Sequence, residues 1–374
     1  MPELQQYLKR DEKAIFGLRA LYETYGYRRY KVSKFEEYDL YAHNKSFLTS
    51  ESILTFTDTD GRLMALKPDV TLSIVKNVKD TGGLQKLYYN ENVYRVSGGF
   101  GGFKEIMQTG LECIGPLDLY SVGEVLMLAA RSLATISERW VLAISHLDFL
   151  SGLLGETGCA EDARAAMLRC VGERNIHGLT EVCCRAGVAS ELTGRICAAA
   201  KLYGPFGEAL GELGAISVNA QTDAALAELG DVHRLMCAYG VEKNLCLDFS
   251  IVNDMNYYNG VSFQGFVDGI PSGILSGGRY DNLMQKMGRR DGAIGFAVYL
   301  DQLERFGGGE RKYDVDVLLL YGPEDDPAQV LQAVRLLTVG GKTVRAARCD
   351  TGAIRCRQKL RMLNGGLEIL ETDD

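Results

Sequence analysis

Alternating apolar and polar positions in residues 88–115 predict two long strands around a glycine-rich loop, Gly98–Gly102. Such a pattern is typical of an antiparallel hairpin. Side chains two and four residues apart on a strand share one face, so Gln108 and Glu112 point the same way, in a row with Lys104. A buried, unpaired glutamate would cost free energy, and this face is therefore expected to look into a pocket.

Helical and strand periodicity organises the chain up to residue 306. A helix over 11–25 is expected to end at Gly26, and a second amphipathic helix is predicted over 118–137. The Asp60-Gly61 pair predicts a hairpin turn. The other predicted segments are a helical stretch over about 147–242, strands over 245–252 and 261–275, and a helix near 297–306.

Three consecutive glycines at 307–309 predict a linker before the last part of the chain. Beyond it, Val315–Tyr321 is predicted as a strand, Pro327–Val339 as a helix and Lys342–Ala346 as a strand. This alternation indicates a small α/β unit. With about 60 residues, such a unit is near the lower limit for an independent fold.

Basic residues cluster in this last unit. They are Arg348, Arg355, Arg357, Lys359 and Arg361. One interpretation is a relic contact with RNA or with another subunit. A solvated helix face is the preferred interpretation.

Composition narrows the function classes. The chain of 374 residues has a net charge of −8 and a pI of about 5.3, which is unusual for a protein whose main partner is nucleic acid. Its ten cysteines lack Cys-x-x-Cys or metal-ligand spacing, and we expect buried free thiols, including the adjacent Cys183 and Cys184. The four histidines also lack ligand spacing, so no metal or cofactor is predicted. A polar start and the apparent lack of an apolar run of membrane-spanning length predict a cytoplasmic protein without a membrane role.

Several segments, in the expected order, resemble the signatures of histidyl-tRNA synthetases, which are class II aminoacyl-tRNA synthetases. They are Leu66–Thr71 (LKPDVT), Tyr94–Arg95 with Lys104–Glu112 (KEIMQTGLE), Asn256–Tyr258 (NYY), Ser276–Asp281 (SGGRYD) and Ala293–Ala297 (AIGFA). The resemblance implies an α+β fold, in which helices flank a class II synthetase-like antiparallel sheet core over 1–306. A helical insertion at about 147–242 and a short α/β domain at 313–374, similar to an abbreviated anticodon-binding domain, are also expected.

The resemblance also implies a histidine pocket. By position, Asp69, Thr71 and Gln108 would receive the α-ammonium, Glu112 and Tyr258 would bracket the imidazole with Tyr280 near that end, and Arg95 would complete the set. Carboxylates suit a cationic ligand, and a Glu–Tyr pair can satisfy both ring nitrogens of an imidazole.

Of the principal arginines that face ATP in the synthetases, only Arg95 is kept in this chain, and the other positions differ. Asn253 and Gln302 stand where the family has arginines, Gly102 stands where it has a basic residue, and Ser97 where it has glutamate. Arginine supplies the fixed positive charge that a triphosphate needs. We therefore expect a scaffold that no longer forms aminoacyl-adenylate, and no catalytic residue is predicted.

A lost ATP site beside a kept histidine pocket is similar to the regulatory subunits of ATP phosphoribosyltransferase, which are paralogues of the synthetase. That resemblance implies a non-catalytic subunit that activates a short-form catalytic subunit and transmits allosteric feedback by L-histidine in the first step of histidine biosynthesis. A homodimer within a hetero-oligomer, without tRNA, is expected. A divergent histidyl-tRNA synthetase using ATP, magnesium and tRNA is the alternative, and a synthetase-like paralogue with another partner is a third.

Overall fold

The protein was analysed as a computed structural model, which describes residues 8–44, 53–79, 82–96, 102–252, 258–307, 312–363 and 365–373. The chain folds as two compact units, one over residues 10–306 and another that begins at Gly307. Each unit has its own hydrophobic core. All seven residues predicted to bind histidine belong to the larger unit.

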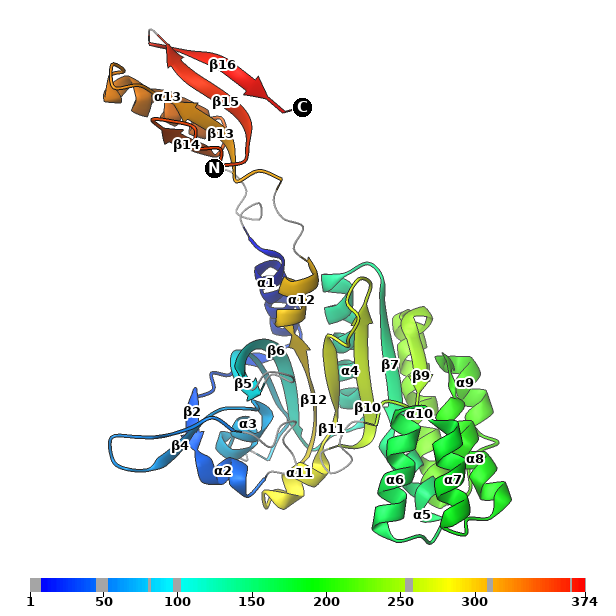
Figure 1. Ribbon diagram of the computed structural model, residues 1–374. Helices are drawn as coiled ribbons and strands as arrows, with labels where there is room; N and C mark the ends of the chain where they lie inside the picture. Colours follow the sequence, from blue (N-terminus) through cyan, green and yellow to red (C-terminus); the bar gives the residue numbers. More distant parts are fainter. Residues whose placement is uncertain are drawn as a thin grey trace. The chain divides into compact units, whose positions relative to one another are not determined.

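In the described part of the larger unit, nine strands form one central sheet (Figure 1). Their order is β1-β5-β6-β12-β11-β10-β7-β9-β8. The bounds are β1 (Arg28–Arg29), β5 (Gln85–Val96), β6 (Phe103–Gly115), β7 (Trp140–His146), β8 (Tyr203–Pro205), β9 (Leu245–Asp248), β10 (Asn259–Val267), β11 (Leu275–Arg279) and β12 (Gly292–Tyr299). Neighbouring strands are antiparallel except β1 beside β5 and β7 beside β9. The predicted antiparallel core is confirmed.

The predicted long hairpin is confirmed as β5 paired with β6. Its register places Glu91 opposite Gln108 and Leu87 opposite Glu112. Alternation along β6 sends Leu111 and Cys113 into the main core, and it sends Gln108 and Glu112 to the other face of the sheet.

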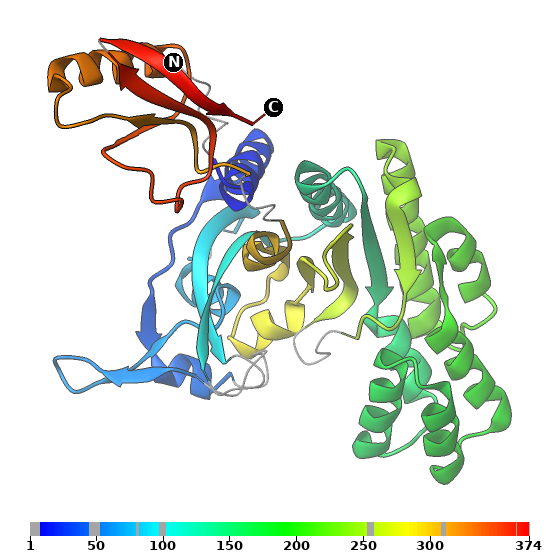
Figure 2. The same ribbon diagram turned by 45° about the horizontal axis from the view of Figure 1, so that its top comes forward.

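Two helices cover the Leu111 face of the sheet, α1 (Arg10–Thr24) and α4 (Leu119–Ile136) (Figure 2). Gly26 follows α1 with φ +79°, as the predicted helix end requires. Asp118 caps α4 by accepting a hydrogen bond from the Ser121 amide at 2.8 Å. By length and composition α4 could span a bilayer, which corrects the expectation that no apolar run is long enough. Its apolar stretch is 67% buried, and this burial accounts for its apolar character.

The opposite face of the sheet carries smaller elements. They are α3 (Thr71–Asn77), α11 (Asp281–Lys286), α2 (Tyr38–Ala42) and a sheet in the order β2 (Phe35–Glu37), β4 (Leu63–Leu66) and β3 (Thr55–Thr57). Gly61 sits at the β3–β4 turn with φ +82°, which confirms the predicted Asp-Gly turn. A second core joins these elements to Tyr89 and Val93 of the hairpin.

The predicted helical insertion is confirmed. It contains α5 (Leu147–Gly155), α6 (Glu161–Gly172), α7 (Ile176–Arg185), α8 (Ser190–Lys201), α9 (Phe206–Leu213) and α10 (Ala220–Tyr239). All ten cysteines of the chain are free thiols, but they are not all buried as expected. Cys183 is buried and Cys184 is exposed, because neighbouring residues on a helix point about 100° apart.

The last helix of the larger unit begins later than predicted. β12 continues through Tyr299, and α12 (Leu300–Gly307) starts only at Leu300. Ala297 and Tyr299 pair with Gly110 and Gln108 of β6, so the hydrogen-bonded ladder keeps this apolar run extended.

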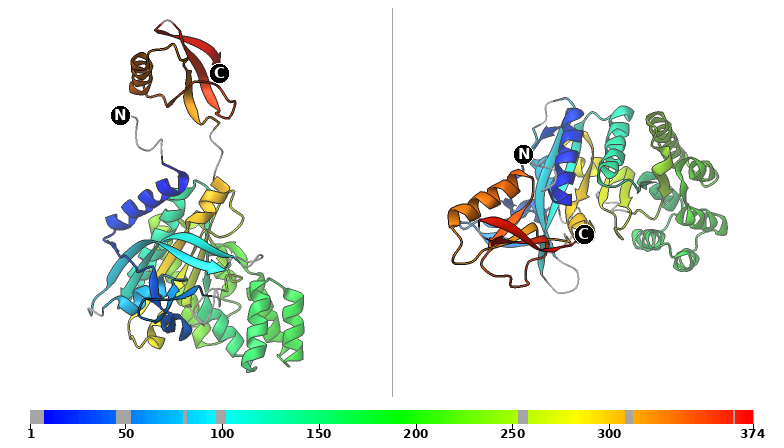
Figure 3. Two further views of the ribbon diagram at one scale, coloured as in Figure 1. Left: turned by 60° about the vertical axis from the view of Figure 1, so that its left-hand side comes forward. Right: turned by 90° about the horizontal axis from the view of Figure 1, so that it is seen from above.

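In the described part of the smaller unit, four strands form a sheet in the order β14-β13-β15-β16 beside helix α13 (Figure 3). The bounds are β13 (Val315–Leu320), α13 (Pro327–Val339), β14 (Val344–Ala347), β15 (Cys356–Leu363) and β16 (Gly366–Thr372). The predicted strand–helix–strand order is confirmed. Asp326 caps α13 by accepting from the Ala328 amide, and Pro327 opens the helix.

The basic cluster is not a helix face, which corrects the preferred interpretation. Arg357, Lys359 and Arg361 lie on β15, because their spacing of two residues follows the pleat of a strand. Lys359 forms ion pairs with Asp350 at 2.9 Å and Glu371 at 2.7 Å. These acids compensate part of the cluster's charge.

Candidate amino-acid pocket

Glu112 is the centre of a buried polar cluster on the sheet face opposite α1 and α4. Its side chain is only 2% exposed. Thr71, at the start of α3, donates a hydrogen bond from its hydroxyl to Glu112 Oε1 at 2.7 Å. Tyr280, at the end of β11, donates from its hydroxyl to Oε2 at 2.5 Å. Three segments that are distant in the sequence therefore meet at one carboxyl group.

Glycines on neighbouring strands leave room for this cluster. Gly295 lies opposite Glu112 in the β6–β12 register, and a Cβ atom there would be 1.9 Å from Glu112 Oε2. A Cβ atom on Gly278 would be 2.7 Å from the ring of Tyr258. The glycines of the Ser276–Asp281 and Ala293–Ala297 segments thus have a steric role beside the polar cluster.

Burial raises the pKa of the Glu112 carboxyl to about 8. The hydrogen bonds from Tyr280 and Thr71 favour the carboxylate and oppose this rise, whereas the nearby charge of Asp69 adds to it. The group therefore holds its proton at neutral pH, and a cationic ligand would favour its ionised form.

Asp69 lies just before α3, and the side chain of Arg95 reaches the same segment from β5. Asp69 accepts a hydrogen bond from the Leu72 amide at 2.9 Å, and Arg95 Nε donates to the Pro68 carbonyl at 3.0 Å. Burial raises the pKa of Asp69, while the Leu72 amide and the positive charge of Arg95 act against that rise. Asp69 thus has a structural role, and one of its carboxylate oxygens supports the helix.

Gln108 is also buried, with 2% exposure. Its amide Nε2 has no hydrogen-bond partner among the described residues. A buried donor without a partner costs about 1–3 kcal/mol, so this position favours a ligand that brings an acceptor such as a carboxylate.

Tyrosines surround the cluster. Burial raises the pKa of Tyr258, and the charges of Glu112 and Asp69 raise it further, so this hydroxyl lies within their electrostatic reach. Tyr89 responds to the same two carboxyls, and a Cβ atom on its partner Gly110 would lie 2.4 Å from the Tyr89 hydroxyl. Tyr89 was not predicted as a pocket residue.

The structure therefore brings the seven predicted residues into one region of the larger unit. Thr71, Glu112 and Tyr280 are joined by hydrogen bonds, and Tyr258 and Asp69 interact with them electrostatically. Arg95 is linked through Asp69. Gln108 shares the face of Glu112 on β6.

Lys104 and Gln302, two of the positions expected from the resemblance to face ATP, lie at the side chain of Asp301. Lys104 donates to Asp301, and the two form an ion pair. Gln302 Nε2 lies 3.4 Å from the same carboxylate. Ser97, Asn253, Asn256 and Tyr257, which carried part of the sequence prediction, lie outside the described residues.

Proteins of known family match this chain over most of its length. The sequence profile described as histidyl-tRNA synthetase matches residues 4–303, well over half of the chain. The chain belongs to the histidyl-tRNA synthetase family. Its sequence is 28% identical to the ATP phosphoribosyltransferase regulatory subunit of Ruminiclostridium cellulolyticum, over 84% of this chain and 77% of that protein.

Solved structures agree on the class II synthetase fold of this family member. An ATP phosphoribosyltransferase regulatory subunit/histidyl-tRNA synthetase from Bacillus halodurans has a TM-score of 0.74 at 25% identity, covering 95% of this chain and 91% of that one. A chain from the ATP phosphoribosyl transferase (HisG:HisZ) complex of Thermotoga maritima has a TM-score of 0.62 at 16% identity, covering 78% and 97%. The predicted fold class is confirmed.

Proposed function

We propose that this family member is a non-catalytic regulatory subunit of ATP phosphoribosyltransferase. It would activate a short-form catalytic subunit and mediate feedback by L-histidine in the first step of histidine biosynthesis. The observation that carries the proposal is the name shared by its curated relatives, which match more than four fifths of the chain at 28–29% identity. The geometry of the site supports it at two points.

The first point is the ion pair between Lys104 and Asp301, near the positions expected to face ATP. Lys104 is the basic residue retained after the hairpin loop, and its partner Asp301 cancels its charge. A charge-assisted contact to phosphate contributes about 1.5–3 kcal/mol, and glutamine at 302 can donate a hydrogen bond without supplying charge. This arrangement is poorly suited to hold a triphosphate for adenylation.

The second point is the buried polar cluster. Glu112, with Tyr280 and Tyr258 nearby, offers an acceptor and hydroxyl groups to the two nitrogens of an imidazole. The resemblance assigns Gln108 to the α-ammonium of the ligand, and its unpartnered Nε2 donor would in addition suit the carboxylate of an amino acid. These features favour histidine as the effector, bound without reaction.

The remaining parts of the proposal concern assembly and location. A homodimer within a hetero-oligomer is part of the proposal, because the resemblance to the regulatory subunits implies it. Action without tRNA is supported by the acids that pair with Lys359 of the basic cluster, because RNA binding needs cations that are free for phosphates. A cytoplasmic location accords with a biosynthetic role.

A divergent histidyl-tRNA synthetase remains the second candidate, favoured by the family match itself and by the double name of the Bacillus halodurans protein. Histidine-dependent exchange of pyrophosphate into ATP separates the two. The regulatory proposal predicts no exchange above background by the pure chain, and co-sedimentation with a short-form catalytic subunit. Robust exchange, with no such complex, would instead establish a synthetase.

A further inference from the structure

The smaller unit exposes apolar side chains that a globular unit normally buries. Of the sixteen large hydrophobic residues that are exposed in the described chain, seven belong to it, although it is much the smaller unit. They are Leu331, Leu336, Val339, Leu363, Leu367, Ile369 and Leu370. Concentrated apolar surface of this kind marks an interaction site.

The sheet of this unit has an uncovered apolar half. α13 packs on β13 and β15 through a small core that includes Val330, Leu319 and Leu360. Farther across the same sheet face, Leu367 and Ile369 of β16 stand opposite Met362 and Leu360 in the register, yet they are 43% and 62% exposed. They continue the apolar face beyond the helix. Among the described residues, α13 is the only helix of this unit (Figure 3).

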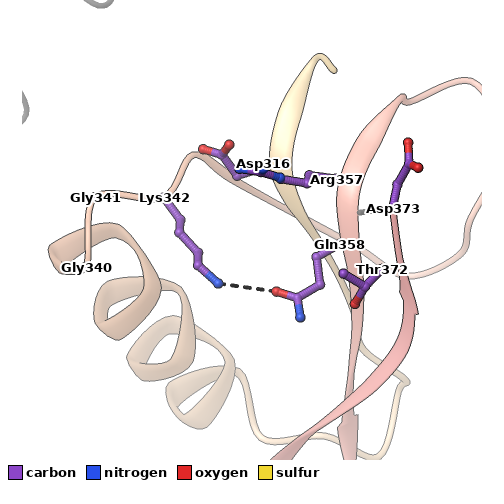
Figure 4. A pocket seen from close by; sticks show the side chains of 8 residues that line it. All are labelled: Asp316, Gly340, Gly341, Lys342, Arg357, Gln358, Thr372 and Asp373. Atoms are coloured by element: carbon purple, nitrogen blue, oxygen red, sulfur yellow. Dashed lines mark hydrogen bonds between the residues drawn. The ribbon is translucent and has the colours of Figure 1, made fainter. Parts of the chain in front are cut away.

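The dimensions of the sheet leave space for a second helix. Four strands about 4.8 Å apart make a face roughly 15–19 Å wide, and helices pack about 8–10 Å apart. A hollow of about 570 Å³ lies beside the end of α13, where Lys342 donates to Gln358 next to Thr372 (Figure 4). The sheet is thus wide enough for one further helix beside α13, and the hollow, which has a polar lining, lies on the β15–β16 side of α13.

The helix α13 presents a complementary surface. Leu331, Leu336 and Val339 are exposed, while Val330 and Ala333 face the sheet. Within the described residues of this unit, one copy therefore carries both an apolar sheet face without a helix and an apolar helix face without a second sheet.

We propose that the C-terminal units of two copies pair about a two-fold axis, with α13 of each copy covering β16 of the other. Both helices would then form one layer between two sheets. A two-fold pairing satisfies both unpartnered surfaces at once and closes the assembly. Charge does not oppose it, because Glu371 of β16 is paired with Lys359 on the other face of its own sheet, and Glu368 stands opposite Arg361.

The test uses the full chain and three lysine variants. Ile369→Lys places a charge on the β16 face, and Val339→Lys places one on the outer face of α13. Leu363→Lys is the matched control, because Leu363 is also exposed apolar surface, at 52% against 62% for Ile369, but follows Met362 on β15 and so points to the other sheet face. Burying an unpaired ammonium should weaken pairing by roughly tenfold or more in the first two variants, with no change in the control.

The rate of amide hydrogen exchange in peptides covering 327–339 and 366–372 reports on this contact even if the larger units also dimerise. Reciprocity is the decisive feature: Ile369→Lys should speed exchange in α13, and Val339→Lys should speed it in β16. If this contact alone joins two copies, both variants should also lower the mass of the protein measured by sedimentation. Variants that affect only their own element would overturn the proposal. Protection that arises only after a short-form catalytic subunit is added would assign the surface to that partner and would also overturn self-pairing.

Discussion

The buried face around Glu112 and the exposed face around Ile369 follow opposite rules. The first gathers polar groups where apolar ones would be cheaper to bury, and the second leaves apolar groups in water. A buried carboxyl with a raised pKa and a donor without a partner are costs that a small charged ligand can offset. The cost of exposing apolar side chains on a sheet and a helix can be offset by contact with another macromolecular surface. The difference distinguishes the proposed ligand site from the proposed assembly site within one chain.

The largest effect is expected at Gly295, where the structure leaves no room for an added Cβ atom. Gly295→Ala would place a Cβ atom 1.9 Å from Glu112 Oε2 and 2.4 Å from the Leu111 carbonyl oxygen, and backbone atoms cannot move aside cheaply. We expect a loss of more than about 3 kcal/mol in the free energy of unfolding by urea titration. Gly230→Ala on α10 is the control, because nothing lies within 4 Å of its added Cβ, and it should be neutral or slightly stabilising. Equal effects of both changes would refute the steric argument.

The next effect concerns the ligand. Glu112→Ala removes the buried acceptor and should weaken histidine binding by about 1.5–3 kcal/mol, or roughly ten- to a hundredfold, in calorimetric titration. Glu105→Ala is the control on the same strand, because odd-numbered Glu105 lies on the other face of β6 and is exposed. Unchanged affinity in Glu112→Ala would place the effector site elsewhere.

An effect of another kind is expected on the pH dependence of stability. The folded-state pKa of Glu112 is about 8, above its ordinary value of 4.5, so the folded chain retains a proton that the unfolded chain releases between these values. This group therefore makes stability fall as pH rises from 4.5 to 8, with no further change above 8. Glu112→Gln cannot ionise, and its urea midpoint should fall less than that of the parent chain across this window. Parallel curves for the two proteins would contradict the raised pKa.

The smallest effect is expected in the C-terminal unit. Leu363→Lys alters a side chain that is already 52% exposed, so the unfolding free energy should change by less than about 0.5 kcal/mol. A loss comparable to that of Gly295→Ala, measured by the same urea titration, would mean that Leu363 is part of the fold of this unit and cannot serve as the control for pairing.

Much of the pocket could be predicted because strand periodicity fixes faces. The spacing of Gln108 and Glu112 placed them together, and the resemblance added Thr71 and Tyr280 from distant segments. Tyr89 was missed because it joins this face only through the hairpin register, in which it stands opposite Gly110. A shift of one residue in the loop exchanges the two faces of a strand, and the loop sequence alone does not set that register.

Other errors also have physical causes. The run from Ala297 is apolar enough for a helix or a buried strand. Pairing with β6 and β11 decides that its first three residues form a strand. For the basic cluster the signal was present, because Arg355, Arg357, Lys359 and Arg361 recur at the two-residue period of a strand. The exposed face of β16 could not be predicted, since its exposure depends on a helix that the short unit lacks among its described residues.

The most direct test is the rate at which a short-form catalytic subunit transfers phosphoribosyl groups from phosphoribosyl pyrophosphate to ATP, measured alone, with this chain, and with this chain and L-histidine. Our account predicts a faster rate with the chain, and histidine inhibition that the Glu112→Ala variant of the chain largely relieves. A rate that does not respond to the chain, or histidine inhibition that is the same with the variant, would contradict it.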